Sequence, residues 1–215
     1  MENLRAIVLT DGDPVAGPLG LPADALVIAA DGGLGLASAL HLDVDVVVGD
    51  MDSASPEDLK RAAQSGARIE RHPTDKDATD LELALNEAID SGATEITVVG
   101  GSGGRLDHLL ANAHLLSRHR YRGIALIWLT ETETVQVCDP DRPVTIRGAV
   151  GGRVSLIPVA GAAGGIATTG LRWPLHGEDL PAGSTRGVSN TMTAEKASVS
   201  VTTGTLLVVQ ERTGP

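Results

Sequence analysis

Short apolar runs alternate with helical patterns over the first 130 residues, and this alternation limits the folds that the chain can adopt. The runs are short enough to be strands and cover residues 4–9, 25–30, 44–48, 67–71, 94–99 and 124–129. Strands that alternate with helices build a layered α/β domain with a mostly parallel sheet. We therefore predict an N-terminal α/β domain over residues 1–135.

The helices between these runs have recognisable ends. Ser55-Pro56-Glu57-Asp58 supplies a capping hydroxyl, a proline in the first turn and acidic residues at the positive helix end. A second helix is expected from about Thr79 to Asp90, before Gly92. A third begins near Arg105, where the spacing of apolar residues predicts one buried face, formed by Leu106, Leu109, Leu110 and Ala113.

The second half of the chain consists of β-branched segments separated by glycine and proline. It lacks an amphipathic helix of useful length, which favours an all-β sandwich or barrel-like domain over residues 136–215. The glycine-rich stretch Ala160–Gly165 lies between two expected strands. We predict a hairpin loop there, with a flexible linker as the alternative.

Charge and cysteine content exclude several classes of protein. A net charge of -11 argues against binding to nucleic acid or to an anionic membrane surface, because both require a surplus of Lys and Arg. Cys138 is the single cysteine, so no intramolecular disulfide can form, and we interpret it as a small buried apolar residue. With no run near the roughly 20 apolar residues of a membrane span, and no targeting segment, we predict a cytoplasmic protein.

Aspartates gather where predicted strands and helices meet. The apolar run Val46–Val48 leads into Gly49-Asp50-Met51-Asp52-Ser53, and Asp75, Asp77 and Asp80 follow about 22 residues later. Carboxylates packed this densely repel one another, so a divalent cation is expected among them. Oxygen ligands without interleaved Cys or His favour Mg2+ or Mn2+ over zinc. This pattern predicts metal-assisted phosphate chemistry.

Four polar clusters are expected at one edge of the sheet, since ligands collect outside the carboxyl ends of parallel strands. They are residues 31–33, 50–52, 75–80 and 100–108. In the last of these, glycines allow close approach to a phosphate and Arg105 offers a planar fork for its oxygens. The segment is neither a Walker loop nor a dinucleotide fingerprint. A tight strand-to-helix turn is the alternative interpretation of its four glycines.

The ordered set of motifs resembles the thiamine pyrophosphokinase family. It comprises Asp31-Gly32-Gly33, residues 49–53, residues 75–81 and residues 100–108, and Gly170–Leu175 with Ser189-Asn190 resembles the family's thiamine-contacting elements. The resemblance implies Mg2+-dependent transfer of diphosphate from ATP to the hydroxyl of thiamine, giving thiamine diphosphate and AMP. It also implies a catalytic α/β domain, a thiamine-binding and dimerising β-sandwich, and a homodimer with shared active sites.

Residue roles follow from the same resemblance. Asp50, Asp52 and Asp80 are the expected metal ligands, direct or through water. Asp75 and Asp77 would complete the acidic shell, one of them accepting the hydroxyl proton. Catalytic roles are also expected for Asp31 and Asp107, which would orient the nucleotide or metal-bound water, and for Arg105, which would bind phosphate. The nucleotide would further contact Gly32, Gly101, Ser102, Gly103, Gly104 and His108.

Trp173 is one of only three aromatic residues and would stack on the aminopyrimidine of thiamine, with Ser189 and Asn190 bonding its edge. The alternative is that Trp173 anchors the sandwich core. The chain departs from the family pattern at Met51, where an aromatic is common, and at Val188, where a hydroxyl residue is frequent.

Two other functions compete with this one. An apolar strand that ends in Asp-x-Asp is also the nucleophile position of haloacid-dehalogenase-like phosphatases, although their downstream lysine and paired aspartates are missing here. The second alternative is a nucleotide-sensing module without turnover, against which the complete acidic set argues.

Overall fold

The computed structural model describes residues 3–15 and 19–212, and contacts divide the chain into two compact units. The first comprises residues 1–112 and 128–131, and the second comprises residues 113–127 and 132–215. The predicted boundary at residue 135 is a single cut, whereas each unit draws on two segments of the chain. Among the described residues, no helix has the length and apolar character needed to cross a membrane.

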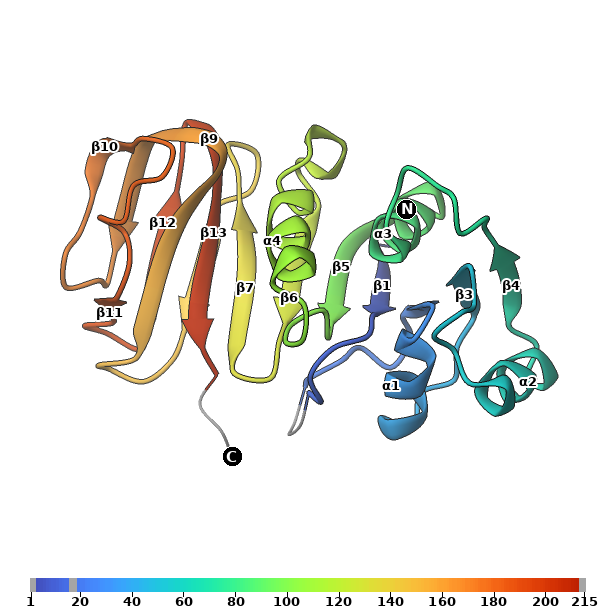
Figure 1. Cartoon of the computed structure of the whole chain (residues 1–215). Coiled ribbons are helices and arrows are strands. Elements are labelled where there is room, and N and C mark those ends of the chain that lie inside the picture. The colour runs from blue at the N-terminus through green and yellow to red at the C-terminus, as the bar shows by residue number, and fades with distance from the viewer. Residues whose placement is uncertain (1–2, 16–18, 213–215) are drawn as a thin grey trace. The chain divides into compact units, whose positions relative to one another are not determined.

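The first unit contains a parallel sheet (Figure 1). Its strands lie in the order β4 (Arg68–Arg71), β3 (Val46–Gly49), β2 (Leu26–Ala30), β1 (Leu4–Leu9) and β5 (Ala93–Val99), and every pairing between them is parallel. The central strands are apolar almost throughout because helices cover parallel sheets on both faces. Their carboxyl ends meet at one edge, which brings the following loops together.

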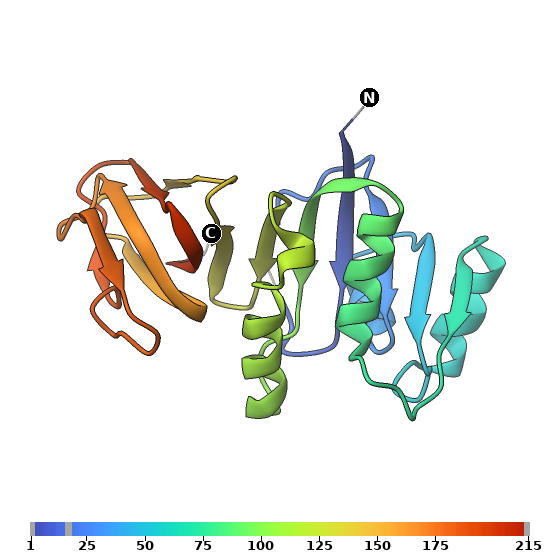
Figure 2. The same ribbon diagram turned by 90° about the horizontal axis from the view of Figure 1, so that it is seen from above.

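Three of the four helices in the described residues of this unit begin within one residue of the predicted starts, and α1 (Gly33–Ala39) is the one for which no start was predicted. The other three are α2 (Pro56–Gln64), α3 (Asp80–Asp90) and α4 (Leu106–Leu115). The last residues of α4 belong to the second unit, which also contains a short 3-10 helix, η1 (His119–Tyr121). The Ser55 hydroxyl accepts a hydrogen bond from the Asp58 N–H at 3.1 Å, and Thr79 caps α3 in the same way. Figure 2 shows α3 lying across the parallel strands, on which it buries Leu81 and Leu85.

The predicted apolar face of α4 is wrong. Leu106 is 68 % exposed and Leu110 is 53 % exposed, whereas Asn112 and Leu115 are buried. The orientation follows from Asn112, whose amide Nδ2 donates to the carbonyl of Gly101 at 3.0 Å. This polar contact turns Asn112 inward, and Leu106 and Leu110 face solvent.

The second unit is an antiparallel β domain, so the predicted fold class is confirmed. Its main strands are β7 (Glu133–Cys138), β13 (Thr203–Glu211), β9 (Arg153–Thr169), β12 (Lys196–Ser200) and β8 (Val144–Arg147), in that order. β10 (His176–Leu180) and β11 (Asn190–Thr191) also pair with β9, and β6 (Ala125–Leu129) is divided between the two units. The core includes Ile146, Leu156, Ile166 and Leu206.

The predicted hairpin loop at Ala160–Gly165 is also wrong, because β9 continues through it as one 17-residue strand (Figure 1). Residues 154–159 of β9 pair with β13, and residues 166–169 pair with β10 and β12. Ala160 and Gly165 have φ values of +56° and +60°. Local left-handed conformations bend a strand, so β9 passes from one sheet of the sandwich to the other.

Candidate active site

A cleft of about 500 Å³ lies within the first unit, walled by the loops that follow β1, β2, β3, β4 and β5. Eight of the predicted site residues line it: Asp31, Gly32, Gly101, Gly103, Gly104, Arg105, His108 and Asp80. Three of the four expected polar clusters therefore line one cleft, whereas Asp50 and Asp52 lie outside its lining and only the adjacent Ser53 contributes to it. Thr10, Asp11 and Gly12 line it as well, and the sequence analysis missed them although they directly follow β1 and obey the same rule.

Asp31 lies at the centre of the acidic group. Its side chain is buried, its φ is +43°, and Oδ2 accepts a hydrogen bond from the Ser53 N–H at 3.2 Å. Burial raises the pKa of Asp31, and the nearby charges of Asp80 and Asp52 raise it further. Oδ1 is buried without any hydrogen-bond partner. A buried carboxylate oxygen of this kind can serve as a ligand for a cation.

Asp50 and Asp52 lie beside Asp31, and each of the three residues offers one oxygen within 4.8 Å of the others. Met51, at φ +66°, is buried in a cluster with Leu34 and Val47, so the chain is anchored between the two acids. Met51 thus fills an apolar site, consistent with a packing role at this departure from the family pattern.

Asp80 begins α3, and its Oδ1 is also buried and accepts no hydrogen bond. Gly49 lies directly beneath it, since a Cβ on Gly49 would be 2.8 Å from that oxygen. Carboxylate oxygens from three strand-end loops, two of them without a hydrogen bond, fit a hard divalent cation, which takes oxygen ligands. Asp31, predicted only to orient other groups, lies among these candidate metal ligands.

Lys76 was not assigned a role from the sequence, yet it lies inside the acidic group. Its Nζ is 2.9 Å from Asp50 Oδ2 and 3.1 Å from Asp80 Oδ1, the second contact being an ion pair without hydrogen-bond geometry. Burial acts to lower the pKa of Lys76, but its interactions with the two carboxylates outweigh burial and raise this pKa. The hydrogen bond from Lys76 lowers the pKa of Asp50.

Asp75 and Asp77 flank Lys76 in the sequence but are exposed and do not line the cleft. Two carboxylate contacts hold Lys76 inward, whereas these two acids are exposed to solvent. Their roles in the acidic shell and in proton transfer stay predictions.

The glycine-rich loop packs closely against the loop that follows β1. The Gly101 N–H donates to the Asp11 carbonyl at 2.9 Å, and a Cβ on Gly100 would lie 2.2 Å from the Thr10 carbonyl oxygen. At Gly103 a Cβ would overlap the carboxyl of Asp13. Loop packing therefore requires at least two of these glycines, as the tight-turn alternative proposes, while the loop still lines the cleft; Ser102 does not.

Arg105 is exposed at the start of α4 and forms a two-point ion pair with Asp107, with contacts of 3.1 and 2.5 Å. The Arg105 guanidinium lowers the pKa of Asp107. Arg105 and His108 line the cleft, whereas Asp107 does not. In this arrangement Asp107 is the resting partner of the arginine that is predicted to bind phosphate.

The predicted thiamine-contacting residues lie in the second unit. Trp173 is 56 % exposed, which contradicts the alternative that it anchors the core, and the Arg172 guanidinium lies 5.0 Å from the centre of its ring. Asn190 is buried, and its amide accepts from the Trp173 N–H at 3.1 Å and donates to the Trp173 carbonyl at 2.8 Å. Asn190 thereby holds the backbone of Trp173. Ser189 is exposed at φ +62°.

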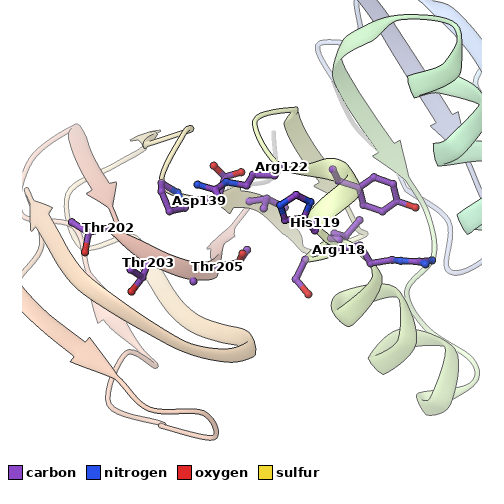
Figure 3. Close-up of a pocket in the computed structure, with 13 residues that line it drawn as sticks. Arg118, His119, Arg122, Asp139, Thr202, Thr203 and Thr205 are labelled. Carbon is purple, nitrogen blue, oxygen red and sulfur yellow. The ribbon is translucent and has the colours of Figure 1, made fainter.

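A second hollow, of about 350 Å³, belongs wholly to the second unit (Figure 3). Arg122 at its wall is paired with Asp141, and Asp139 accepts hydrogen bonds from the N–H groups of Gly123 and Asp141. No residue predicted for the site lines this hollow. Arg122 and Asp139 both have partners within the protein, in contrast to Asp31 Oδ1 of the acidic cleft, which accepts no hydrogen bond.

A parallel α/β unit whose cleft combines converging carboxylates with a glycine-rich loop and an arginine defines a nucleotide-dependent phosphotransferase. The family profile described as "Thiamin pyrophosphokinase, catalytic domain" matches residues 21–128, and "Thiamin pyrophosphokinase, vitamin B1 binding domain" matches residues 144–207. The chain belongs to the thiamin pyrophosphokinase family. The predicted family and enzyme class are confirmed.

Individual relatives agree with the profiles. The thiamine pyrophosphokinase of Bacillus subtilis (strain 168) is 26% identical over 162 residues, which cover 75% of this chain and 76% of that protein. Thiamine pyrophosphokinase 1 of Oryza sativa subsp. japonica is 30% identical over 76% of this chain, but the match spans only 64% of the rice protein. A crystal structure of the Bacillus subtilis enzyme superposes with a TM-score of 0.84 at 23% identity, covering 97% of this chain and 99% of that one.

Proposed function

We propose that the acidic cleft of the first unit is where this enzyme, as a thiamine diphosphokinase, binds ATP together with Mg2+ or Mn2+. The observation that carries the proposal is the convergence of Asp31, Asp50, Asp52 and Asp80, two of them with buried oxygens that lack a hydrogen bond. These four residues would hold the cation. When bound, it supplies positive charge that neutralises the polyphosphate.

The reaction moves a diphosphate group. The thiamine hydroxyl oxygen forms a bond to the β-phosphorus of ATP, the bond from this phosphorus to the oxygen bridging the α-phosphate breaks, and AMP leaves with that electron pair. Positioning and charge stabilisation supply most of the catalysis in such transfers. Arg105 would leave Asp107 to bind phosphate oxygens, and a carboxylate, Asp75 or Asp77, would accept the hydroxyl proton.

The transfer can be tested with purified protein, ATP, Mg2+ and thiamine, with AMP and thiamine diphosphate separated by chromatography. Equal amounts of both products are expected, formed only when all three additions are present. Release of inorganic phosphate without thiamine diphosphate would instead support the phosphatase, and nucleotide binding without any product would support the sensor.

Thiamine would stack on Trp173, with Ser189 at its edge. The exposed indole supports this, because a ring that is 56 % exposed and held by a buried asparagine is presented for contact and does not fill the core. Asn190 would act mainly by holding Trp173, since its amide oxygen accepts from Trp173 and Thr191.

A homodimer with shared active sites, in the cytoplasm, completes the proposal. Leu106 and Leu110 are large apolar residues exposed on one helix, and such surface supports a protein interface. Light scattering should give twice the chain mass. Mixing Asp80→Asn with Trp173→Leu subunits at low thiamine should restore about a quarter of wild-type activity if each site uses both subunits, and should give only the average of the two separate variants if each subunit is self-sufficient.

A further inference from the structure

Lys76 has a position that the family's reaction does not by itself explain. It lies in the turn between β4 and α3, four residues before Asp80, and its side chain is only 13% exposed. The ammonium is 2.9 Å from Asp50 Oδ2 and 3.1 Å from Asp80 Oδ1. It therefore connects carboxylates from two separate loops, the end of β3 and the start of α3.

The charge balance explains why a cation is required there. Asp31, Asp50, Asp52 and Asp80 bring four carboxylates together, while Lys76 is the ammonium bonded to two of them. Like charges at this spacing repel strongly when they are partly shielded from water. One ammonium offsets part of the repulsion but leaves Oδ1 of Asp31 without a hydrogen bond.

The same two oxygens would be needed by a divalent cation, so the ammonium and the cation compete for them. We propose that Lys76 is a resident counter-ion that holds the acidic group together before the metal binds and then turns its ammonium to the triphosphate. The ammonium can reach a triphosphate in the cleft, because Lys76 lines the same cleft as Gly103 and Arg105. Its flexible four-carbon stem can rotate to bring the ammonium there. This inference rests on the proposed function of the cleft.

The wild-type protein offers a direct test, because it contains only three lysines, Lys60, Lys76 and Lys196. Trace acetylation with acetic anhydride, followed by peptide mass spectrometry, measures the accessibility of each ammonium. Lys76 should react slowly in EDTA, several-fold faster with Mg2+ alone, and slowly again with Mg2+ and α,β-methylene ATP. Lys60 and Lys196 are exposed and serve as internal controls whose rates should not change. If the acetylation rate of Lys76 does not change on addition of Mg2+, the inference is overturned.

Substitution supplies a second test in which two affinities must move in opposite directions. Lys76→Met keeps the stem and removes the charge, so Mn2+ binding measured by calorimetry should tighten by about tenfold. Binding of α,β-methylene ATP in the presence of Mg2+ should weaken, and Lys60→Met should change neither affinity. The inference fails unless the metal affinity rises and the nucleotide affinity falls.

The outcomes separate this inference from the proposed function. Product formation from ATP and thiamine, combined with a Lys76 that does not respond to Mg2+, rejects the counter-ion role alone. A Lys76 that responds to Mg2+ in a protein without turnover supports the counter-ion role and rejects the proposed reaction.

Discussion

Gly49 lies so close to Asp80 that a Cβ added to the glycine would be 2.8 Å from Asp80 Oδ1 and 3.0 Å from the Cβ of Asp31. The φ of Gly49 is +146°, a conformation that side chains rarely adopt. The last residue of β3 thus allows two carboxylates from other loops to approach each other. Any side chain here would push them apart.

Gly49→Ala should therefore lower activity by at least about a hundredfold, a loss typical of displaced charge-stabilising groups, and should weaken Mn2+ binding. Steady-state kinetics and calorimetry measure the two effects. Gly35→Ala is the matched control, because nothing lies within 4 Å of a Cβ there and alanine is the better helix former. Equal activity and equal Mn2+ affinity of Gly49→Ala and Gly35→Ala would contradict the close approach of Gly49 to Asp80 and Asp31.

Asp31→Asn should stabilise the metal-free protein while abolishing activity. Burial raises the folded-state pKa of Asp31 above the ordinary value of 3.8. The native state therefore loses stability as the pH rises from this ordinary value through the folded-state pKa. At pH 7 the buried charge remains a cost that the neutral amide removes. The melting temperature in EDTA should exceed that of wild type at pH 7, and the difference should shrink near pH 4. A lower melting temperature at pH 7 would argue against repulsion at this site.

Trp173→Leu should raise the KM for thiamine at least about fivefold and leave the KM for ATP nearly unchanged, because stacking on an aromatic ring is worth roughly 1 kcal/mol or more. Its unfolding free energy should change little, since the indole is mostly exposed. Equal changes in both KM values would oppose the stacking role.

Asn190→Ala tests whether the Asn190 amide stabilises the protein by holding the backbone of Trp173. It leaves the N–H and carbonyl of Trp173 without their partner, so unfolding should become easier by about 1–3 kcal/mol in urea titrations. Thr191→Ala is a nearby control that keeps the Asn190 amide. An Asn190→Ala protein of wild-type stability would show that the amide does not hold the Trp173 backbone.

Cys138 should resist thiol reagents in the folded protein. It is fully buried, and burial raises the pKa of its thiol to about 11. Thiolate is the reactive form, so labelling by an aromatic disulfide reagent at pH 8 should be slow and should accelerate on addition of denaturant. Because the unfolded thiol ionises first, stability should fall as pH rises from about 9 to about 11. Rapid labelling of the native protein would contradict the burial.

Sequence patterns predicted the cleft well because its chemistry is encoded locally. Each strand run is followed at once by its polar cluster, and the carboxyl ends of parallel strands share an edge whatever the strand order is. The grouping of Asp50 and Asp80 near one edge of the sheet could therefore be predicted without coordinates, while their role as metal ligands stays a prediction. Lys76 could not, because a lysine between two aspartates in a polar turn looks like any solvated residue.

The sequence by itself determined the strands of the first unit, the starts of three helices, and that acidic loops meet a glycine-rich one. Hydrophobic periodicity and capping residues carry this information, and both act over a few neighbouring residues. Only the tertiary structure decided that β1 lies between β2 and β5, that β9 bends from one sheet to another, and that Leu106 and Leu110 face solvent. These outcomes depend on pairings between segments far apart in the chain, whose energies no local pattern records.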